Sequence, residues 1–104
     1  SNMTGHERIA AINIRGAIHW IVGGYYNAYQ DGYDEYVPKS KQSIIEEVYD
    51  TVMSDAFGYE AVNFGRAPRE MRFAGKEFIM NYITKKINED EDVAELAEHY
   101  GWTN

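Results

Sequence analysis

The sequence predicts an all-α domain, a compact bundle or orthogonal array of four helices in which the first helix is the longest. Three observations support this fold class. Apolar residues recur at helical spacing in four segments, residues that favour helix ends flank those segments, and no short run alternates apolar and polar residues like a strand. The expected helices cover about residues 6–30, 40–57, 68–88 and 91–100.

A length of 104 residues suits one domain of ordinary size. Ser1 and Asn2 precede Met3 and resemble the remainder of a cleaved expression tag, so residues 3–104 are expected to form the single all-α domain. With 44% hydrophobic residues, the chain can bury a core. No signal peptide and no apolar stretch of membrane-spanning length is recognised, which favours a soluble, cytoplasmic protein without membrane contact.

The first helix, residues 6–30, has an apolar face that is expected to join the core. This face holds Ala10, Ile14, Ala17, Ile18, Ile21, Val22, Tyr25, Ala28 and Tyr29. The opposite face is unusual because it carries small residues around one Trp instead of charges, namely Gly16, Trp20 and Gly23. Two alternatives explain it: the helix is central in a bundle and buried on both sides, or this face is the seam of a homodimer.

The ends of the later helices are set by residues with known capping preferences. Ser40 is the expected N-cap of the second helix and Gly58 its C-terminal signal. Pro68 suits the first turn of the third helix, Asp90 caps the fourth, and Gly101 ends it. Residues 59–66 are either a loop or a short extended segment.

The net charge of −7 is divided into blocks. Residues 31–65 and residues 89–104 each carry −6, while residues 66–88 between them carry +4. The overall acidity disfavours direct binding to nucleic acid. Since the chain has no Cys, disulfides, thiolate metal sites and cysteine nucleophiles are excluded.

The basic block contains a candidate anion-binding cluster. Arg69, Arg72 and Lys76 lie at i, i+3 and i+7 near the start of the third helix, where backbone amides also favour anions, and Arg66 precedes them. The alternative is that these side chains form surface ion pairs with the acidic face of the second helix, formed by Glu46, Glu47 and Asp50.

A cluster of Tyr and acidic residues follows the first helix and is the preferred candidate for a partner-binding surface. Its members are Tyr26, Tyr33, Asp34, Glu35 and Tyr36. Tyr side chains combine a rigid apolar ring with a polar tip, and together with carboxylates they can accept Lys or Arg from a partner. The alternative is that the loop tyrosines only pack the loop against the domain.

No catalytic, cofactor or metal site is expected. The three His residues lie apart in the sequence, at His6, His19 and His99, and only the last has acids at helical spacing. No nucleophile elbow, P-loop or metalloprotease motif occurs.

We therefore expect a small, acidic, non-catalytic protein–protein interaction or regulatory module, whose partner is another protein or a second copy of the chain. One alternative is an acidic inhibitor that mimics nucleic acid, of the kind that phages and mobile elements encode. A further alternative is a binder of a small anion or phosphate ligand at the start of the third helix.

Overall fold

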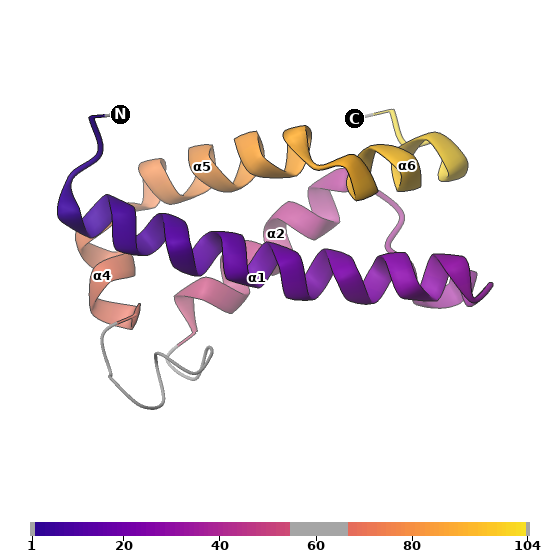
Figure 1. Ribbon diagram of the computed structural model, residues 1–104, viewed down its shortest axis with the longest axis horizontal. Helices are drawn as coiled ribbons and strands as arrows, with labels where there is room; N and C mark the ends of the chain where they lie inside the picture. Colours follow the sequence, from indigo (N-terminus) through magenta and orange to yellow (C-terminus); the bar gives the residue numbers. More distant parts are fainter. Residues whose placement is uncertain (1, 55–66, 104) are drawn as a thin grey trace.

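The computed structural model describes residues 2–54 and 67–103, with residues 67–70 described by their backbone alone. The described part is all-α, as the sequence predicts, and holds five α-helices, one short 3-10 helix and no strand. The helices are α1 (Gly5–Gln30), η1 (Asp34–Tyr36), α2 (Lys41–Met53), α4 (Ala67–Ala74), α5 (Lys76–Glu89) and α6 (Glu91–Tyr100). Helix α1 runs the length of the molecule, α5 and α6 follow one another beside it, and α2 lies behind it (Figure 1).

Helix α1 is the longest, at 26 residues, and both of its ends are capped. At the N-terminus Thr4 and Glu7 form a capping box, in which each side chain accepts a hydrogen bond from the other's backbone N–H. At the C-terminus Gly32 adopts a positive φ of 82°, and the Tyr33 N–H donates to the Ala28 carbonyl over 2.8 Å. This Schellman-type end turns the chain back towards the helix it has just left.

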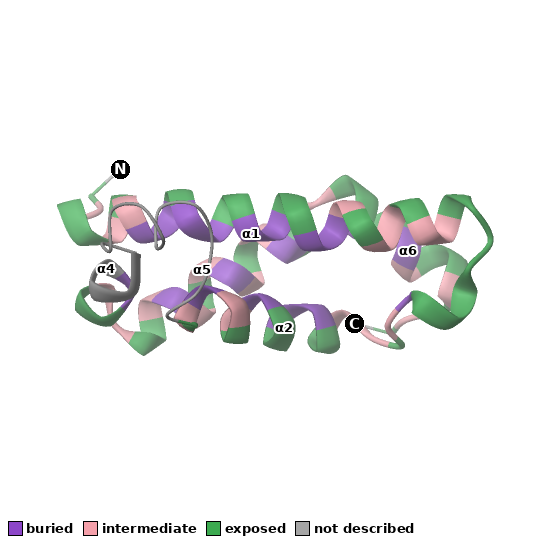
Figure 2. Ribbon diagram, turned by 90° about the horizontal axis from the view of Figure 1, so that it is seen from below, coloured by how far each residue is buried: buried purple, intermediate pink, exposed green. Residues whose placement is uncertain are grey.

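The core lies between the inner faces of α1, α2 and α5, where the buried residues face one another (Figure 2). Branched aliphatic side chains dominate it: Ile14, Ile44, Ile79, Ile83 and Ile87 are fully buried. The predicted inner face of α1 is confirmed from Ala10 to Val22. Burial of these side chains supplies the main driving force for the fold.

The third predicted helix, residues 68–88, is in fact two helices. Helix α4 ends at Ala74 and α5 begins at Lys76, because Gly75 between them adopts φ 91° and ψ 146°, which no helix contains. Glycine reaches this conformation without the steric penalty of a Cβ atom. The break redirects the chain, so that α4 packs on the N-terminal half of α1 and α5 continues along the bundle (Figure 1).

The second predicted helix ends earlier than expected. Helix α2 starts after the predicted N-cap Ser40, whose hydroxyl accepts from the Ser43 N–H over 3.1 Å. It stops at Met53 with the extended residue Ser54 as its C-cap, and not at residue 57. Gly58 and the segment 59–66 lie outside the described residues.

The last predicted helix, residues 91–100, is confirmed together with its caps. The Asp90 carboxylate accepts from the Val93 N–H over 3.0 Å. Gly101 takes a left-handed φ of 72°, and the Trp102 N–H donates to the Ala97 carbonyl over 2.9 Å. The Trp102 ring then packs against the core as the hydrophobic contact of this helix end.

The outer face of α1 is not buried in the described structure. Helix α1 is central, in that it contacts all the other described α-helices. Its Gly16 and Trp20 nevertheless lie exposed, with Trp20 at 81% of its maximal accessibility. The expectation of a helix buried on both sides is therefore wrong at Gly16 and Trp20.

Candidate functional site

The two acidic blocks meet at one end of the molecule. The turn at Gly32 brings η1 back towards α6, and the Tyr100 hydroxyl donates to Asp34 Oδ1 over 2.6 Å. We call this region the acidic aromatic end, formed by Tyr26, Tyr29, Tyr33, Asp34, Glu35, Tyr36, Glu95, Glu98, His99 and Tyr100. It joins the C-terminal part of α1, η1 and α6 (Figure 2).

One carboxylate ties α1 to α6. Glu95 accepts hydrogen bonds from the hydroxyls of Tyr26 and Tyr29, over 2.9 and 3.0 Å, one on each oxygen. These bonds to Glu95 raise the pKa of both phenols, because loss of either proton would set two negative charges side by side. Both tyrosines therefore stay neutral donors that orient the carboxylate.

Aromatic contacts continue this cluster along α6. The Tyr29 ring lies 4.9 Å from the His99 ring and 6.0 Å from the Tyr100 ring, between centroids, and both contacts are edge-on. The hydrogen bond to Asp34 raises the pKa of Tyr100 to about 12, so this hydroxyl also remains a donor at neutral pH. The cluster is thus held by interlocked rings and by hydrogen bonds between elements far apart in sequence.

Two tyrosines of this end extend into solvent. Tyr33 is 54% exposed and Tyr36 is 66% exposed, and their ring centroids lie 6.1 Å apart. More than half of each side chain is therefore open to solvent. Asp34 and Glu35 stand between the two rings in sequence, and residues 31–38 and 89–103 contain no Lys or Arg.

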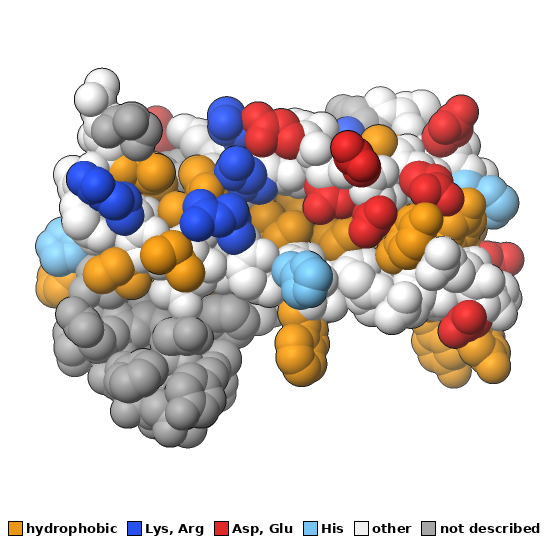
Figure 3. Space-filling model, in the orientation of Figure 1, with side chains coloured by type: hydrophobic (Ala, Val, Ile, Leu, Met, Phe, Trp, Pro, Cys, Tyr) orange, Lys and Arg blue, Asp and Glu red, His pale blue; other side chains and the backbone are white. Residues whose placement is uncertain are grey.

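Charge is divided across one face of the molecule. Figure 3 shows most of the Asp and Glu side chains of this face over one half and most of the Lys and Arg side chains over the other. The acidic half covers the α6 side, whose residues 90–98 hold five carboxylates and no base. This face of the molecule is therefore polarised along its length.

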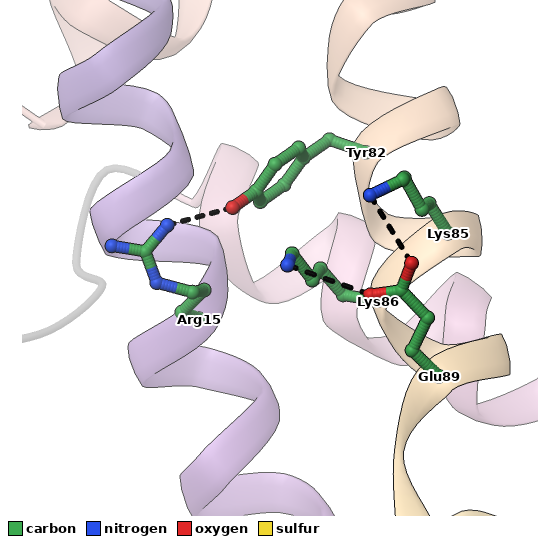
Figure 4. Close-up of polar contacts among 5 residues, drawn as sticks. All are labelled: Arg15, Tyr82, Lys85, Lys86 and Glu89. Carbon is green, nitrogen blue, oxygen red and sulfur yellow. Dashed lines mark hydrogen bonds and ion pairs between the residues drawn. The ribbon is translucent and has the colours of Figure 1, made fainter. Parts of the chain in front are cut away.

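The basic half is centred on residues that the sequence did not single out. Arg15 Nη1 on α1 donates to the Tyr82 hydroxyl on α5 over 2.6 Å, and Lys86 Nζ lies 5.5 Å from the Tyr82 ring centroid (Figure 4). Lys85 and Lys86 both reach Glu89, at 3.1 and 3.5 Å. These lysines lower the pKa of Glu89, chiefly through the Lys85 hydrogen bond. The Lys85-Lys86 pair was visible in the sequence, whereas its approach to Arg15 depends on helix packing.

The predicted anion-binding cluster is divided by the break at Gly75. Arg72 and Lys76 are both exposed, but they belong to α4 and α5 and do not share the expected helical face. Arg69 lies in the first turn of α4, of which only the backbone is described, and Arg66 lies outside the described residues.

The acids of α2 do not form the expected ion pairs with Arg72 or Lys76. The Tyr25 hydroxyl donates to Glu47, and Glu46 accepts from Gln42 over 3.3 Å. Asp50 is exposed. Burial, followed by the Glu47 hydrogen bond, raises the pKa of Tyr25 to about 12.

The outer face of α1 holds a second candidate surface, which we call the α1 face: Ile12, Gly16, His19, Trp20 and Gly23. Ile12 is 60% exposed, and a Cβ on Gly16 or Gly23 would meet no described atom within 4 Å. Beside it lies a shallow hollow of about 310 Å³, lined by His19, Val22, Gly23, Tyr26, Asn27, Asp90 and Asp92. Burial, then the nearby acids led by Asp90, raises the pKa of Asp92.

Neither surface resembles a metal centre. In residues 2–54 and 67–103, no group of three or more His, Asp or Glu side chains is placed to hold an ion. Asp92, Glu95 and His99 share one side of α6, but both oxygens of Glu95 already accept hydrogen bonds from Tyr26 and Tyr29.

The chain matches no known protein family, no curated protein and no solved structure. Within the described ranges, none of the helices combines the length and the apolar character needed to cross a membrane.

Proposed function

We propose that this protein is a small, non-catalytic protein–protein interaction module that binds a cationic segment of a partner at the acidic aromatic end. The observation that carries the proposal is the exposed pair of Tyr33 and Tyr36, whose rings lie 6.1 Å apart within the acidic part of the surface. We place its action in the cytoplasm, which the absence of Cys supports.

The chemistry of this surface favours a Lys- or Arg-containing peptide. Aromatic faces attract cations, and an Arg guanidinium stacks on Tyr while its remaining N–H groups reach carboxylates. Asp34 and Glu35 lie between the two tyrosines in the sequence, and Glu95 and Glu98 lie on α6, to which Asp34 is bonded through Tyr100. Arginine suits this surface better than lysine. The ammonium group of lysine is a compact point charge, which neither stacks on a ring as a plane nor forms a bidentate pair with a carboxylate.

The surface is organised before a partner arrives. The Tyr100–Asp34 hydrogen bond fixes η1 on α6, and Tyr26 and Tyr29 fix the Glu95 carboxylate. Side chains that are already ordered lose little conformational entropy on binding. This preorganisation supports a binding role. Tyr33 and Tyr36 are also exposed and do not belong to the hydrophobic core, so their rings are not needed to hold the core together.

The test is binding of a short fluorescent peptide of alternating Arg and Ala, followed by anisotropy. Each exposed cation–π contact contributes about 0.5–1 kcal/mol, so Y33A/Y36A should bind about 5–30-fold more weakly than the unmodified protein. The double variant Y33F/Y36F keeps both rings and should retain binding. A peptide of alternating Glu and Ala should not bind.

The alternative of an acidic nucleic-acid mimic keeps one supporting observation, the meeting of both acidic blocks at Asp34 and Tyr100. Arg15 and Lys85 on the same molecule weaken it, because a mimic should present acids over a continuous face. The same peptide titration distinguishes the nucleic-acid mimic from the proposed peptide-binding module. A mimic would bind the Arg peptide through charge alone, so Y33A/Y36A would leave its affinity unchanged.

A further inference from the structure

The α1 face carries the most exposed large apolar side chain described in this chain. Trp20 is 81% exposed and Ile12 is 60% exposed, and both lie on the one helix that spans the molecule. Exposed Trp is rare on monomeric surfaces and is enriched where proteins meet. The flanking residues Gly16 and Gly23 add no side chain that would hold another backbone away.

The charges beside this face indicate what covers it. On the N-terminal side, Arg15 projects from α1 towards α5, where Lys85 and Lys86 also lie (Figure 4). On the C-terminal side, Asp90 and Asp92 line the hollow next to Gly23. The surface beside the α1 face is therefore basic near Arg15 and acidic near Gly23.

We propose that a second copy of this chain covers the α1 face, with the two α1 helices antiparallel about a twofold axis near His19. Arg15 and Gly23 each lie four residues from His19, about 6 Å along the helix on opposite sides. The twofold rotation therefore sets Arg15 of each copy opposite the Asp90–Asp92 pair beside Gly23 of the other. A parallel pairing would instead set like charges together.

The size of the face suits such a pairing. The molecule measures 39 × 28 × 17 Å, and α1 lies along the side of 39 × 28 Å that faces the viewer in Figure 1. This side is larger than the about 800 Å² that each partner buries in a stable interface. A twofold contact of this kind is isologous and closed, so it produces a dimer and no filament. The seam is centred on Trp20 and is separate from Tyr33 and Tyr36, so it does not depend on the proposed function.

The experiment is sedimentation equilibrium of the full chain over a wide concentration range. The unmodified protein should have twice the chain mass of 12.0 kDa. Trp20→Ala should weaken dimerisation by at least about tenfold, as expected for a central Trp anchor. Tyr36→Ala removes an exposed aromatic ring outside the seam and should leave the dimer unchanged. A monomer at every concentration, or a dimer that is insensitive to Trp20→Ala, overturns the proposal.

Charge exchange tests the antiparallel register. Arg15→Glu and Asp92→Lys should each weaken the dimer. The double variant should restore it, because the carboxylate introduced into one copy then faces the ammonium introduced into the other. Circular dichroism of each variant separates loss of folding from loss of the seam. Failure of the double variant to recover, with the helical signal intact, overturns the antiparallel arrangement.

The absence of Cys offers an independent check on orientation. A single His19→Cys substitution places one thiol near the proposed axis and should give rapid disulfide-linked dimers under oxidation. Gln30→Cys, at the far end of α1, should not, because antiparallel helices hold the two ends about 33 Å apart. Equal cross-linking at both positions would indicate a parallel pairing and overturn the proposal.

Discussion

The orientation of α1 makes a quantitative prediction about stability. Ile14 is fully buried, and Ile14→Ala removes three carbon atoms from the core. At about 0.8 kcal/mol for each buried methyl or methylene group, the loss of hydrophobic burial alone costs about 2.4 kcal/mol. The residual cavity raises the total cost to about 3–4 kcal/mol of unfolding free energy. Trp20 is larger, but only the remaining fifth of its surface is buried, about 50 Å², so Trp20→Ala should cost about 1 kcal/mol.

Urea unfolding followed by far-ultraviolet circular dichroism measures both values. The titrations are run at several protein concentrations and extrapolated to dilute solution, because self-association adds stability that depends on concentration. A loss of more than about 2 kcal/mol for Trp20→Ala in dilute solution would show that this side chain belongs to the core. That result, with a small cost for Ile14→Ala, would refute the assignment of inner and outer faces of α1.

Three further predictions concern helix ends and pH. Gly101→Ala should lose about 1 kcal/mol of unfolding free energy through its left-handed φ of 72°, and Gly101→Asn should lose less; equal losses would argue against the αL cap. Asp90→Ala should lose about 1 kcal/mol by removing the bond to the Val93 N–H, while Asp90→Asn, which still accepts it, should be nearly neutral. The pKa of Tyr25 rises from 10.0 to about 12, so the stability that this neutral side chain contributes is present below pH 10 and is lost as the pH rises towards 12. The urea midpoint should therefore fall between pH 10 and pH 12, and it should fall less steeply for Tyr25→Phe. An equally steep fall in both proteins would count against the Glu47 bond.

Local signals were sufficient to predict most helices and caps. The 3.6-residue period of α1 and the short-range preferences of Ser40, Asp90 and Gly101 act within one or two turns, so the sequence contains them directly. The break at Gly75 was missed because the apolar period continues from Met71 to Ile79 across it. The isolated Gly75 within this helical pattern was the one local signal of a break, and the prediction did not use it.

The candidate surfaces were harder to predict than the helices, because they depend on how the helices pack against one another. The Tyr-rich loop could be identified from composition, but its contact with α6 joins Asp34 to Tyr100, 66 residues later in the chain. Likewise, a helix face with Gly and Trp is compatible with burial or with exposure, and only the positions of α2, α5 and α6 decide between them. The basic cluster of Arg15, Lys85 and Lys86 arises from the same packing.

The most direct test of the interaction role is a map of amide NMR shifts during addition of the alternating Arg-Ala peptide. We predict that shifts concentrate on residues 33–36 and on the C-terminal half of α6, near Tyr100, while the amides of the α4–α5 junction at Gly75 stay unchanged. Shifts spread evenly over the molecule, or centred on Trp20 with none at Tyr33 and Tyr36, would contradict a binding role for the acidic aromatic end.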